Sequence, residues 1–305
     1  QPRRRVGRRP RGHAVSRVPY PRPFVPAAPA AGGGATLPDD PAAVLLDAGN
    51  PSTLTGLDEA GVGTSYTPAA ARQLLGLATD PGLPSSGLVA LWRASSLSLA
   101  DGDPVGTWAP VAGTPGNLTA SGSARPTFRA TGSPAGGPAV EFDGASDYLS
   151  LSSPSGLPTG ASAGTIVAIL SRMAGGAGLR HVVMYGSVAN NSSRGLATSN
   201  GAWATHEWAT PMVSGSDAPR TLAGHVLGHL YDGSAVTLWV DGVPAVARTV
   251  ALATVAPAII VGSRIVPAAE LAAFRLMELA IYSTALTDAQ WAQVMAHARI
   301  AHGVA

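Results

Sequence analysis

Two carboxylates stand two residues apart in the segment PAVEFDG, at Glu141 and Asp143. If this segment is a strand, alternate side chains share a face, so the strand would present both carboxylates together. Retaining glycosidases use such a pair, with the two carboxyl groups about 5–5.5 Å apart, one acting as nucleophile and the other as acid and base. Glycoside cleavage is therefore the first chemistry that the sequence raises.

A second set of residues suits binding rather than reaction. The segment from 185 to 208 is rich in aromatic, amide and basic side chains. A sugar ring has an apolar face that an aromatic ring can cover and a hydroxyl edge that polar side chains can hydrogen-bond. We therefore expect a glycan site in the loops of this segment, built from Tyr185, Asn190, Asn191, Arg194, Trp203, His206 and Trp208. The alternative is that Trp203 and Trp208 are core residues, as aromatic residues in strands usually are.

Other catalytic patterns are absent from the sequence. It has no H-E-x-x-H spacing, and its lack of cysteine excludes disulfides and thiolate metal sites. His225 and His229 are four residues apart on an expected strand and so share a face. We interpret them as polar strand residues rather than as a metal pair. On these grounds we expect no enzyme.

Basic charge is concentrated at the start of the chain. All 20 basic residues are arginines, and eight lie within the first 22 positions, at Arg3, Arg4, Arg5, Arg8, Arg9, Arg11, Arg17 and Arg22. The remaining 12 arginines face 18 acidic residues, which gives residues 23–305 a formal charge of −6. Arginine clusters neutralise phosphate, but this segment holds few aromatic residues. We therefore expect it to dock on acidic protein surfaces rather than on nucleic acid.

Composition divides the chain into three parts. Residues 1–36 form a basic, then Pro/Ala-rich, then glycine-rich arm that is expected to be extended. Residues 37–86 form a connector or anchor with short predicted helices over 40–49 and 67–80. In residues 87–305, short β-rich runs alternate with Gly, Ser, Pro and Asp clusters, which predicts a sandwich. The sequence has no run of 18 apolar residues, so it predicts no membrane-spanning helix.

Three stretches carry the clearest secondary-structure signals. Two Asp-Gly pairs, at 232–233 and 241–242, separate apolar runs and predict a three-stranded meander over residues 225–249. The run TIVAIL, residues 165–170, is apolar on both faces, which predicts a central strand covered on each side. Thr287 and Gln290 predict a capping box at the start of a terminal helix that packs by Trp291, and Gly303 predicts the end of that helix.

The order of these segments resembles a known family. GLVALWRASSLSLADGDPVGTW, PAVEFDGASDYLSL, the LWVDGV hairpin and LMELAIYSTALTDAQ with its terminal helix follow one another as in a laminin-G-like, or concanavalin A-like, jelly roll. Such domains are common in bacterial surface proteins and tailed-phage virions. The resemblance covers roughly residues 87–305. It implies a mostly β fold, in which two antiparallel sheets stack about 10 Å apart and a C-terminal helix follows.

The resemblance also bears on the acidic residues. Glucanases of related folds are expected to carry Glu-x-Asp-x-Glu, which this sequence lacks, and the family pattern makes Phe142 a core residue and Asp143-Gly144 a turn. The family often binds a cation near one rim, for which Asp143 and Asp147 are the matching residues. Calcium needs six to eight oxygen ligands, and the alternative is that both acids cap turns. We expect no cofactor to be required.

A basic, proline-rich arm before such a domain resembles the attachment segment of a phage head fibre, decoration or tail protein. The sequence therefore predicts a virion structural protein on the surface of an extracellular particle. Its arm would dock on capsid, portal or tail subunits, it would be homo-oligomeric within the particle, and its jelly roll would be displayed to host glycans. Two alternatives stay open: a secreted or surface bacterial lectin-like module, and a polysaccharide-cleaving enzyme of the same fold.

Overall fold

The computed structural model describes residues 80–172, 177–208, 224–264 and 269–304, together with the backbone of four further strands. The chain divides into two compact units, Gln1–Pro68 and Ala69–Ala305. In the first unit, β1 (Val44–Leu46), β2 (Leu54–Leu57) and β3 (Gly63–Tyr66) form an antiparallel sheet in that order.

Two sequence predictions concern this part of the chain. Strand β1 lies within residues 40–49, so the helix predicted there is wrong; β1 pairs along its length with β2, and this pairing overrides a weak local helix signal. The basic arm at residues 1–36, with all eight of its arginines, and residues 67–79 of the second predicted helix lie outside the described residues.

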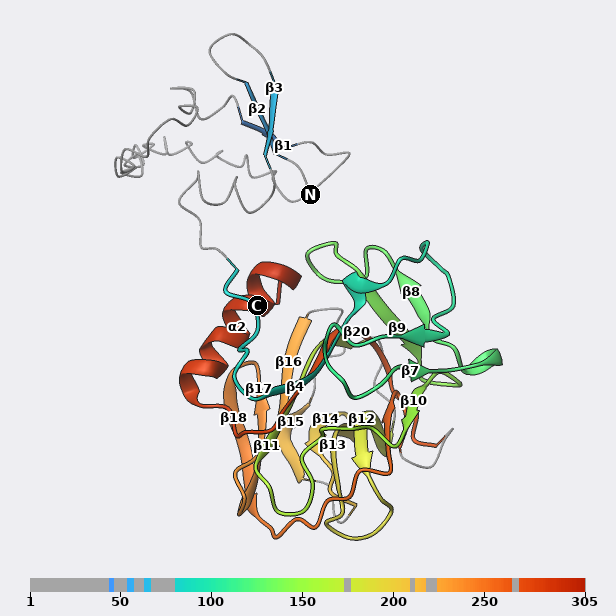
Figure 1. Cartoon of the computed structure of the whole chain (residues 1–305), viewed down its shortest axis with the longest axis vertical. Coiled ribbons are helices and arrows are strands. Elements are labelled where there is room, and N and C mark those ends of the chain that lie inside the picture. The colour runs from blue at the N-terminus through green and yellow to red at the C-terminus, as the bar shows by residue number, and fades with distance from the viewer. Residues whose placement is uncertain are drawn as a thin grey trace, which may run out of the picture. The chain divides into compact units, whose positions relative to one another are not determined.

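The second unit contains an antiparallel sandwich of two sheets (Figure 1). The eight-stranded sheet consists, in spatial order, of β15 (Met212–Asp217), β14 (Ala202–Thr205), β13 (Ser193–Ser199), β12 (Leu179–Gly186), β19 (Ala258–Val261), β10 (Leu149–Ser152), β7 (Leu118–Thr119) and β5 (Thr107–Trp108). The nine-stranded sheet runs through β18 (Val243–Thr249), β17 (Ala235–Val240), β16 (Gly224–Tyr231), β11 (Gly164–Arg172), β20 (Ala273–Tyr282), β4 (Leu88–Arg93) and β6 (Ala112–Gly113). Its two remaining strands, β9 (Ala139–Asp143) beside β20 and β8 (Thr127–Arg129) beside β9, extend it.

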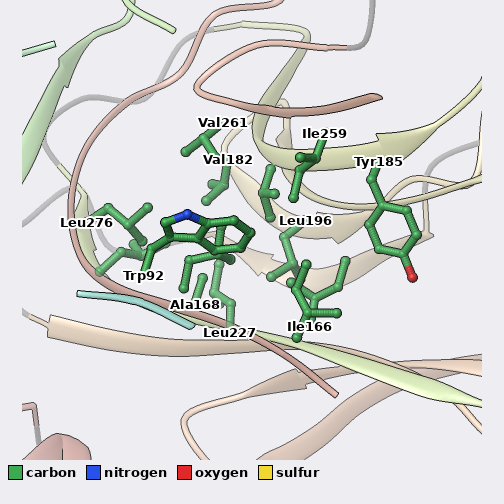
Figure 2. Close-up of a cluster of buried hydrophobic side chains, with 14 of the residues drawn as sticks. Trp92, Ile166, Ala168, Val182, Tyr185, Leu196, Leu227, Ile259, Val261 and Leu276 are labelled. Atoms are coloured by element: carbon green, nitrogen blue, oxygen red, sulfur yellow. The ribbon is translucent and has the colours of Figure 1, made fainter. Parts of the chain in front are cut away.

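The main core lies between the two sheets. Figure 2 shows Trp92 and Leu276 of the nine-stranded sheet directed toward Val182 and Val261 of the other sheet. Strand β11 lies at the centre of its sheet, between β16 and β20. Its even-numbered residues from 166 to 170 face this core, and Val167 and Ile169 face a second cluster on the opposite side. The predicted central strand with two apolar faces is confirmed.

The second cluster is covered by α2 (Asp288–His302), the one α-helix among the described residues. Thr287 accepts a hydrogen bond from the backbone N–H of Gln290, whose side chain accepts one from the backbone N–H of Thr287, and Gly303 ends the helix with φ 70°. The indole of Trp291 stacks on that of Trp239 with ring centroids 4.8 Å apart. The predicted capping box, stop signal and Trp-bearing face are therefore confirmed.

The predicted meander is confirmed as β16, β17 and β18. Its two turns differ in detail. Asp241 and Gly242 both have positive φ, at 51° and 80°, as the sequence predicts, whereas at the other turn only Gly233 does. There the carboxylate of Asp232 accepts hydrogen bonds from the backbone N–H groups of Ser234 and Ala235, which holds the turn by another route.

The fold class that the sequence predicts is thus confirmed for the second unit: mostly β, with two antiparallel sheets and a C-terminal helix. The described helices are too short and too polar to include a membrane span.

Candidate functional site

Most of the predicted glycan residues are in the interior. Tyr185, Arg194 and Trp203 are each at most 2% exposed. The Tyr185 hydroxyl donates to the Pro158 carbonyl oxygen at 3.2 Å. A sugar cannot reach these three side chains without opening the sandwich. Their assignment to a surface site is therefore corrected: they belong to the core, which for Trp203 is the alternative stated above.

Arg194 shows why a charged residue can be in that core. Its guanidinium donates hydrogen bonds to the Thr254 hydroxyl at 3.1 Å and to the Ser162 carbonyl at 2.6 Å, and it lies 5.0 Å from the centre of the Tyr231 ring. These contacts and the Tyr231 ring offset part of the cost of burying the charge, although Arg194 Nη1 has no hydrogen-bond partner among the described residues. Arg194 therefore connects the loop that contains Ser162 to β13, and its role is structural.

The remaining members lie at or near the surface. Asn190 is exposed, Asn191 and Trp208 are half-buried, and His206 lies just beneath, at 7% exposed. The Asn191 backbone N–H donates to the carbonyl of Glu207 at 2.8 Å, so the β12–β13 turn runs beside the end of β14. The structure therefore brings Asn191 next to the segment that carries His206 and Trp208.

His206 and Trp208 form a closed ring of contacts with three residues that sequence reasoning missed. His206 Nδ1 lies 2.9 Å from His181 Nε2, and His181 Nδ1 lies 3.2 Å from Glu270 Oε2. The other Glu270 oxygen lies 3.3 Å from Arg264 Nη1, and the Arg264 guanidinium lies 5.6 Å from the centre of the Trp208 ring. The rings of Trp208 and His206, 5.8 Å apart, complete the circuit. We call these five residues the Trp208 cluster.

Three parts of the fold position the Trp208 cluster. His181 comes from β12, His206 and Trp208 follow β14, and Arg264 and Glu270 come from the connection between β19 and β20. Trp208 and Glu270 both have left-handed backbone conformations, with φ 61° and 55°. Such φ values are uncommon for bulky residues and persist only where the surrounding structure holds them. Residues with these values cluster at functional sites.

The Trp208 cluster combines a fixed charge pair with an aromatic surface. The contact with His181 lowers the pKa of Glu270 despite partial burial, and Arg264 acts in the same direction, so the carboxylate is charged at neutral pH. The side chains of Arg264 and Glu270 are 31% and 30% exposed, so both retain access to solvent. The site offers an indole ring, a donor and an acceptor side by side, which suits binding of a ligand with an apolar face and hydroxyl groups.

The predicted catalytic carboxylates have other partners. Glu141 accepts hydrogen bonds from Arg129 and Arg275, each at 2.7 Å, and is only 13% exposed. Phe142 is fully buried, and Gly144 has φ 71° in a turn, as the family pattern implies. Glu141 therefore belongs to an ion-pair triad that links β9, β8 and β20. That the chain is not an enzyme stays a prediction.

The loop proposed for calcium is held by its own acids. Asp143 Oδ1 accepts from the backbone N–H groups of Ala145, Ser146 and Asp147 at 2.8–3.0 Å, and Asp147 Oδ2 accepts from the Asp143 N–H at 3.0 Å. Burial raises the pKa of Asp147 to about 6, and hydrogen bonds lower that of Asp143 although burial opposes them. This is the geometry of the turn-capping alternative, and calcium binding stays a prediction.

His225 and His229 each have a carboxylate of their own. His225 Nδ1 lies 2.9 Å from Asp241 Oδ2, and His229 Nε2 lies 3.2 Å from Glu207 Oε1. The other oxygen of Glu207, Oε2, pairs with Arg248. The two histidines therefore serve separate pairs, which agrees with their interpretation as strand residues.

No family model matches the sequence, and no curated protein matches it. Solved structures do match the fold. The fold is a jelly-roll β-sandwich. The binding domain of Paraclostridial Mosquitocidal Protein 1 is 12% identical, with a TM-score of 0.50, over 68% of this chain and 52% of that one. A mutant of HCR/D is 8% identical, with a TM-score of 0.50, over 70% and 52%. A Trypanosoma rangeli sialidase in complex with sialic acid is 14% identical, with a TM-score of 0.48, over 83% and 43%. The chain spans about half the length of these structures or less, and at such identities the likeness concerns the fold alone.

Proposed function

We propose that this chain is a lectin-like binding module and that its Trp208 cluster recognises a carbohydrate. The observation that carries the proposal is the half-buried ring of Trp208. The backbone of this residue is left-handed, and its ring lies near the charge pair of Arg264 and Glu270. The jelly roll supplies a rigid support for such a site, and the same fold serves as a binding domain in Mosquitocidal Protein 1. The proposal is of binding without catalysis.

The chemistry of the Trp208 cluster favours a neutral sugar. Arg264 and Glu270 neutralise each other at 3.3 Å, so the site offers one donor and one acceptor rather than net charge. Adjacent hydroxyl groups of a hexose can accept from the guanidinium and donate to the carboxylate, and hydrogen bonds to charged partners are the stronger ones. The indole would cover the apolar face of the ring.

The finer proposal is that the module is displayed on a phage-like particle. What supports it is the sequence: eight arginines within the first 22 positions precede a body with a formal charge of −6. In purified particles, the protein would co-sediment with the capsid in stoichiometric amount. Recovery only as a secreted or cell-surface protein would favour the bacterial lectin-like alternative.

The binding site is tested by a glycan array followed by calorimetric titration of the best neutral sugar. Trp208→Ala and Arg264→Ala are each expected to weaken binding at least tenfold, about 1.4 kcal/mol, and Trp208→Phe to retain part of it. Arg125→Ala, which removes an exposed arginine outside the cluster, is the matched control and is expected to bind as the unchanged protein does. Unaltered affinity in folded Trp208→Ala and Arg264→Ala proteins would overturn the site, as would failure of every glycan to bind.

A further inference from the structure

A second group of ionisable side chains lies where α2 meets the nine-stranded sheet. Glu278 from β20 and His297 and His302 from α2 bring one ligand atom each to within 4.8 Å of the others. Glu278 and His297 are 3% exposed and His302 is 9% exposed. Among the described residues this is the one place where three side chains of metal-binding type converge in this way.

The distances within the group are close to those of a metal centre. Glu278 Oε1 lies 3.1 Å from His297 Nε2 and 3.0 Å from His302 Nε2. Around a tetrahedral Zn²⁺ with bonds of about 2.0–2.1 Å, neighbouring ligand atoms are about 3.3 Å apart. The two imidazole rings are perpendicular, with centroids 5.5 Å apart, so they approach the carboxylate from different directions. Small side-chain adjustments would place all three atoms around one ion.

His297 also has the outer partner that metal-binding histidines usually have. Its Nδ1 lies 2.8 Å from Asp80 Oδ1 and 3.0 Å from Asp80 Oδ2, which directs Nε2 toward Glu278. A carboxylate on the far nitrogen fixes the orientation of the ring and raises its basicity as a ligand. Gln293 holds the same segment by donating to the carbonyl of Gly82 at 3.1 Å.

The second oxygen of Glu278 supplies an independent observation. Glu278 Oε2 is buried and has no hydrogen-bond partner among the described residues, whereas Oε1 faces both histidines and lies 3.1 Å from Arg93 Nε. A buried unsatisfied carboxylate oxygen is costly. If Oε1 bound a cation, Arg93 could shift to Oε2, and both oxygens would then be satisfied.

The charges allow a divalent ion. Asp80 and Glu278 contribute two negative charges and Arg93 one positive charge, and the two imidazoles add none once the incoming ion displaces any proton on each Nε2 into solvent. Asp80 is 36% exposed on its side chain and His302 11%, so the group borders solvent on this side. Two imidazoles with one carboxylate suit Zn²⁺ better than calcium, which prefers a larger set of oxygens.

We propose that Glu278, His297 and His302 bind one Zn²⁺ ion, with Asp80 as the outer partner of His297 and the fourth position open to water. The ion would tie the C-terminal half of α2 to β20 and to the segment that enters the sandwich at residue 80. The site is separate from the Trp208 cluster and does not depend on sugar binding.

The test uses the full chain, stripped with a chelator and dialysed against micromolar ZnCl₂. We expect one Zn²⁺ per chain by elemental analysis, and with Co²⁺ in its place an intense visible absorption typical of four-coordinate geometry. His302→Ala and Glu278→Gln are each expected to lower Zn²⁺ affinity at least tenfold. His225→Ala, which disrupts a histidine–carboxylate pair without a third ligand, is the matched control and is expected to retain the ion.

Folding of each variant is checked by circular dichroism, and His302, the most exposed of the three ligands, is the substitution least disruptive to the core. Retention of the ion at unchanged affinity in both ligand variants would overturn the proposal. So would the absence of stoichiometric Zn²⁺ and of the Co²⁺ absorption in the unchanged protein, because that measurement needs no substitution.

Discussion

Charged residues within the sandwich mostly lie in small groups of two or three interacting side chains. Glu141 lies between Arg129 and Arg275, Glu207 pairs with His229 and Arg248, and Arg194 is enclosed by hydroxyl and carbonyl oxygens. Removing one member of such a group leaves the others desolvated and unpaired, which costs more than the pair itself contributes. These groups are therefore the places where single substitutions affect stability most selectively.

The Glu141 triad predicts a specific pH dependence. Burial raises the pKa of Glu141, but hydrogen bonds from Arg129 and Arg275 outweigh it and lower the pKa below 4.5. The stabilisation is therefore fully present above about pH 4.5 and is lost as the pH falls through the lower, folded-state pKa. Glu141→Gln is expected to cost about 1–2 kcal/mol at neutral pH and progressively less as the pH falls below 4.5.

Urea unfolding of the two proteins across this range measures the difference. A cost for Glu141→Gln that is the same at neutral and acidic pH would contradict the ionic role of the triad.

Single-residue burial is also where sequence reasoning was least successful. Arg194 looked like a surface ligand because charged residues are seldom buried without partners. Its partners, Ser162 and Thr254, lie in loops that are distant in the sequence, and no local pattern announces that they converge. The same holds for Arg264, Glu270 and His181, which meet His206 and Trp208 through the fold alone.

At the scale of elements, α2 packs on the nine-stranded sheet through a close contact at one glycine. Gly228 lies in β16 beneath the stacked rings of Trp239 and Trp291. A Cβ at this position would lie 2.1 Å from the Trp291 ring, which is rigid and cannot move away as a flexible chain end would. The glycine is therefore required for α2 to lie close to β16.

We expect Gly228→Ala to lower stability by about 1–3 kcal/mol through overpacking, measured as a shift in the urea midpoint. Gly106→Ala is the matched control, because its Cβ would have no neighbour nearer than 3.7 Å and its φ is not positive. Equal stability of the two variants would show that α2 does not depend on this close contact.

Elements defined by local signals were predicted well. The capping box at Thr287, the meander turns and the two-faced apolar run of β11 each depend on residues close in sequence, where propensity and periodicity act directly. The helix predicted over residues 40–49 failed for the opposite reason. Its apolar residues Val44, Leu45 and Leu46 pair with β2, and this contact outweighs a short and weak helical pattern.

At the scale of the whole molecule, the sandwich depends on its last strand. Strand β20 pairs with β11, β4 and β9, and it contributes Phe274, Leu276, Leu279 and Ile281 to the main core. Its pairing with β4 joins residues near 90 to residues near 280. The family resemblance predicts two stacked antiparallel sheets but neither their strand order nor their register, because the register is fixed by contacts across the whole chain.

A chain that ends at Ala272 is therefore expected not to fold. It would lack the partner of three strands and, because α2 is lost as well, it would expose one edge of β11 and the face that carries Val167 and Ile169. Near-ultraviolet circular dichroism and thermal unfolding would show no cooperative transition. A cooperative transition in the shortened chain would show that the sandwich forms without β20.

The unequal burial of the tryptophans has an optical consequence. Of the six in the chain, five are buried, and Trp208 alone is half-buried at the surface. A water-soluble collisional quencher such as acrylamide would therefore act on one fluorophore, while the other five emit from an apolar environment. The native protein thus carries its own reporter at the Trp208 cluster, and occupancy there would be read as shielding of that single emission.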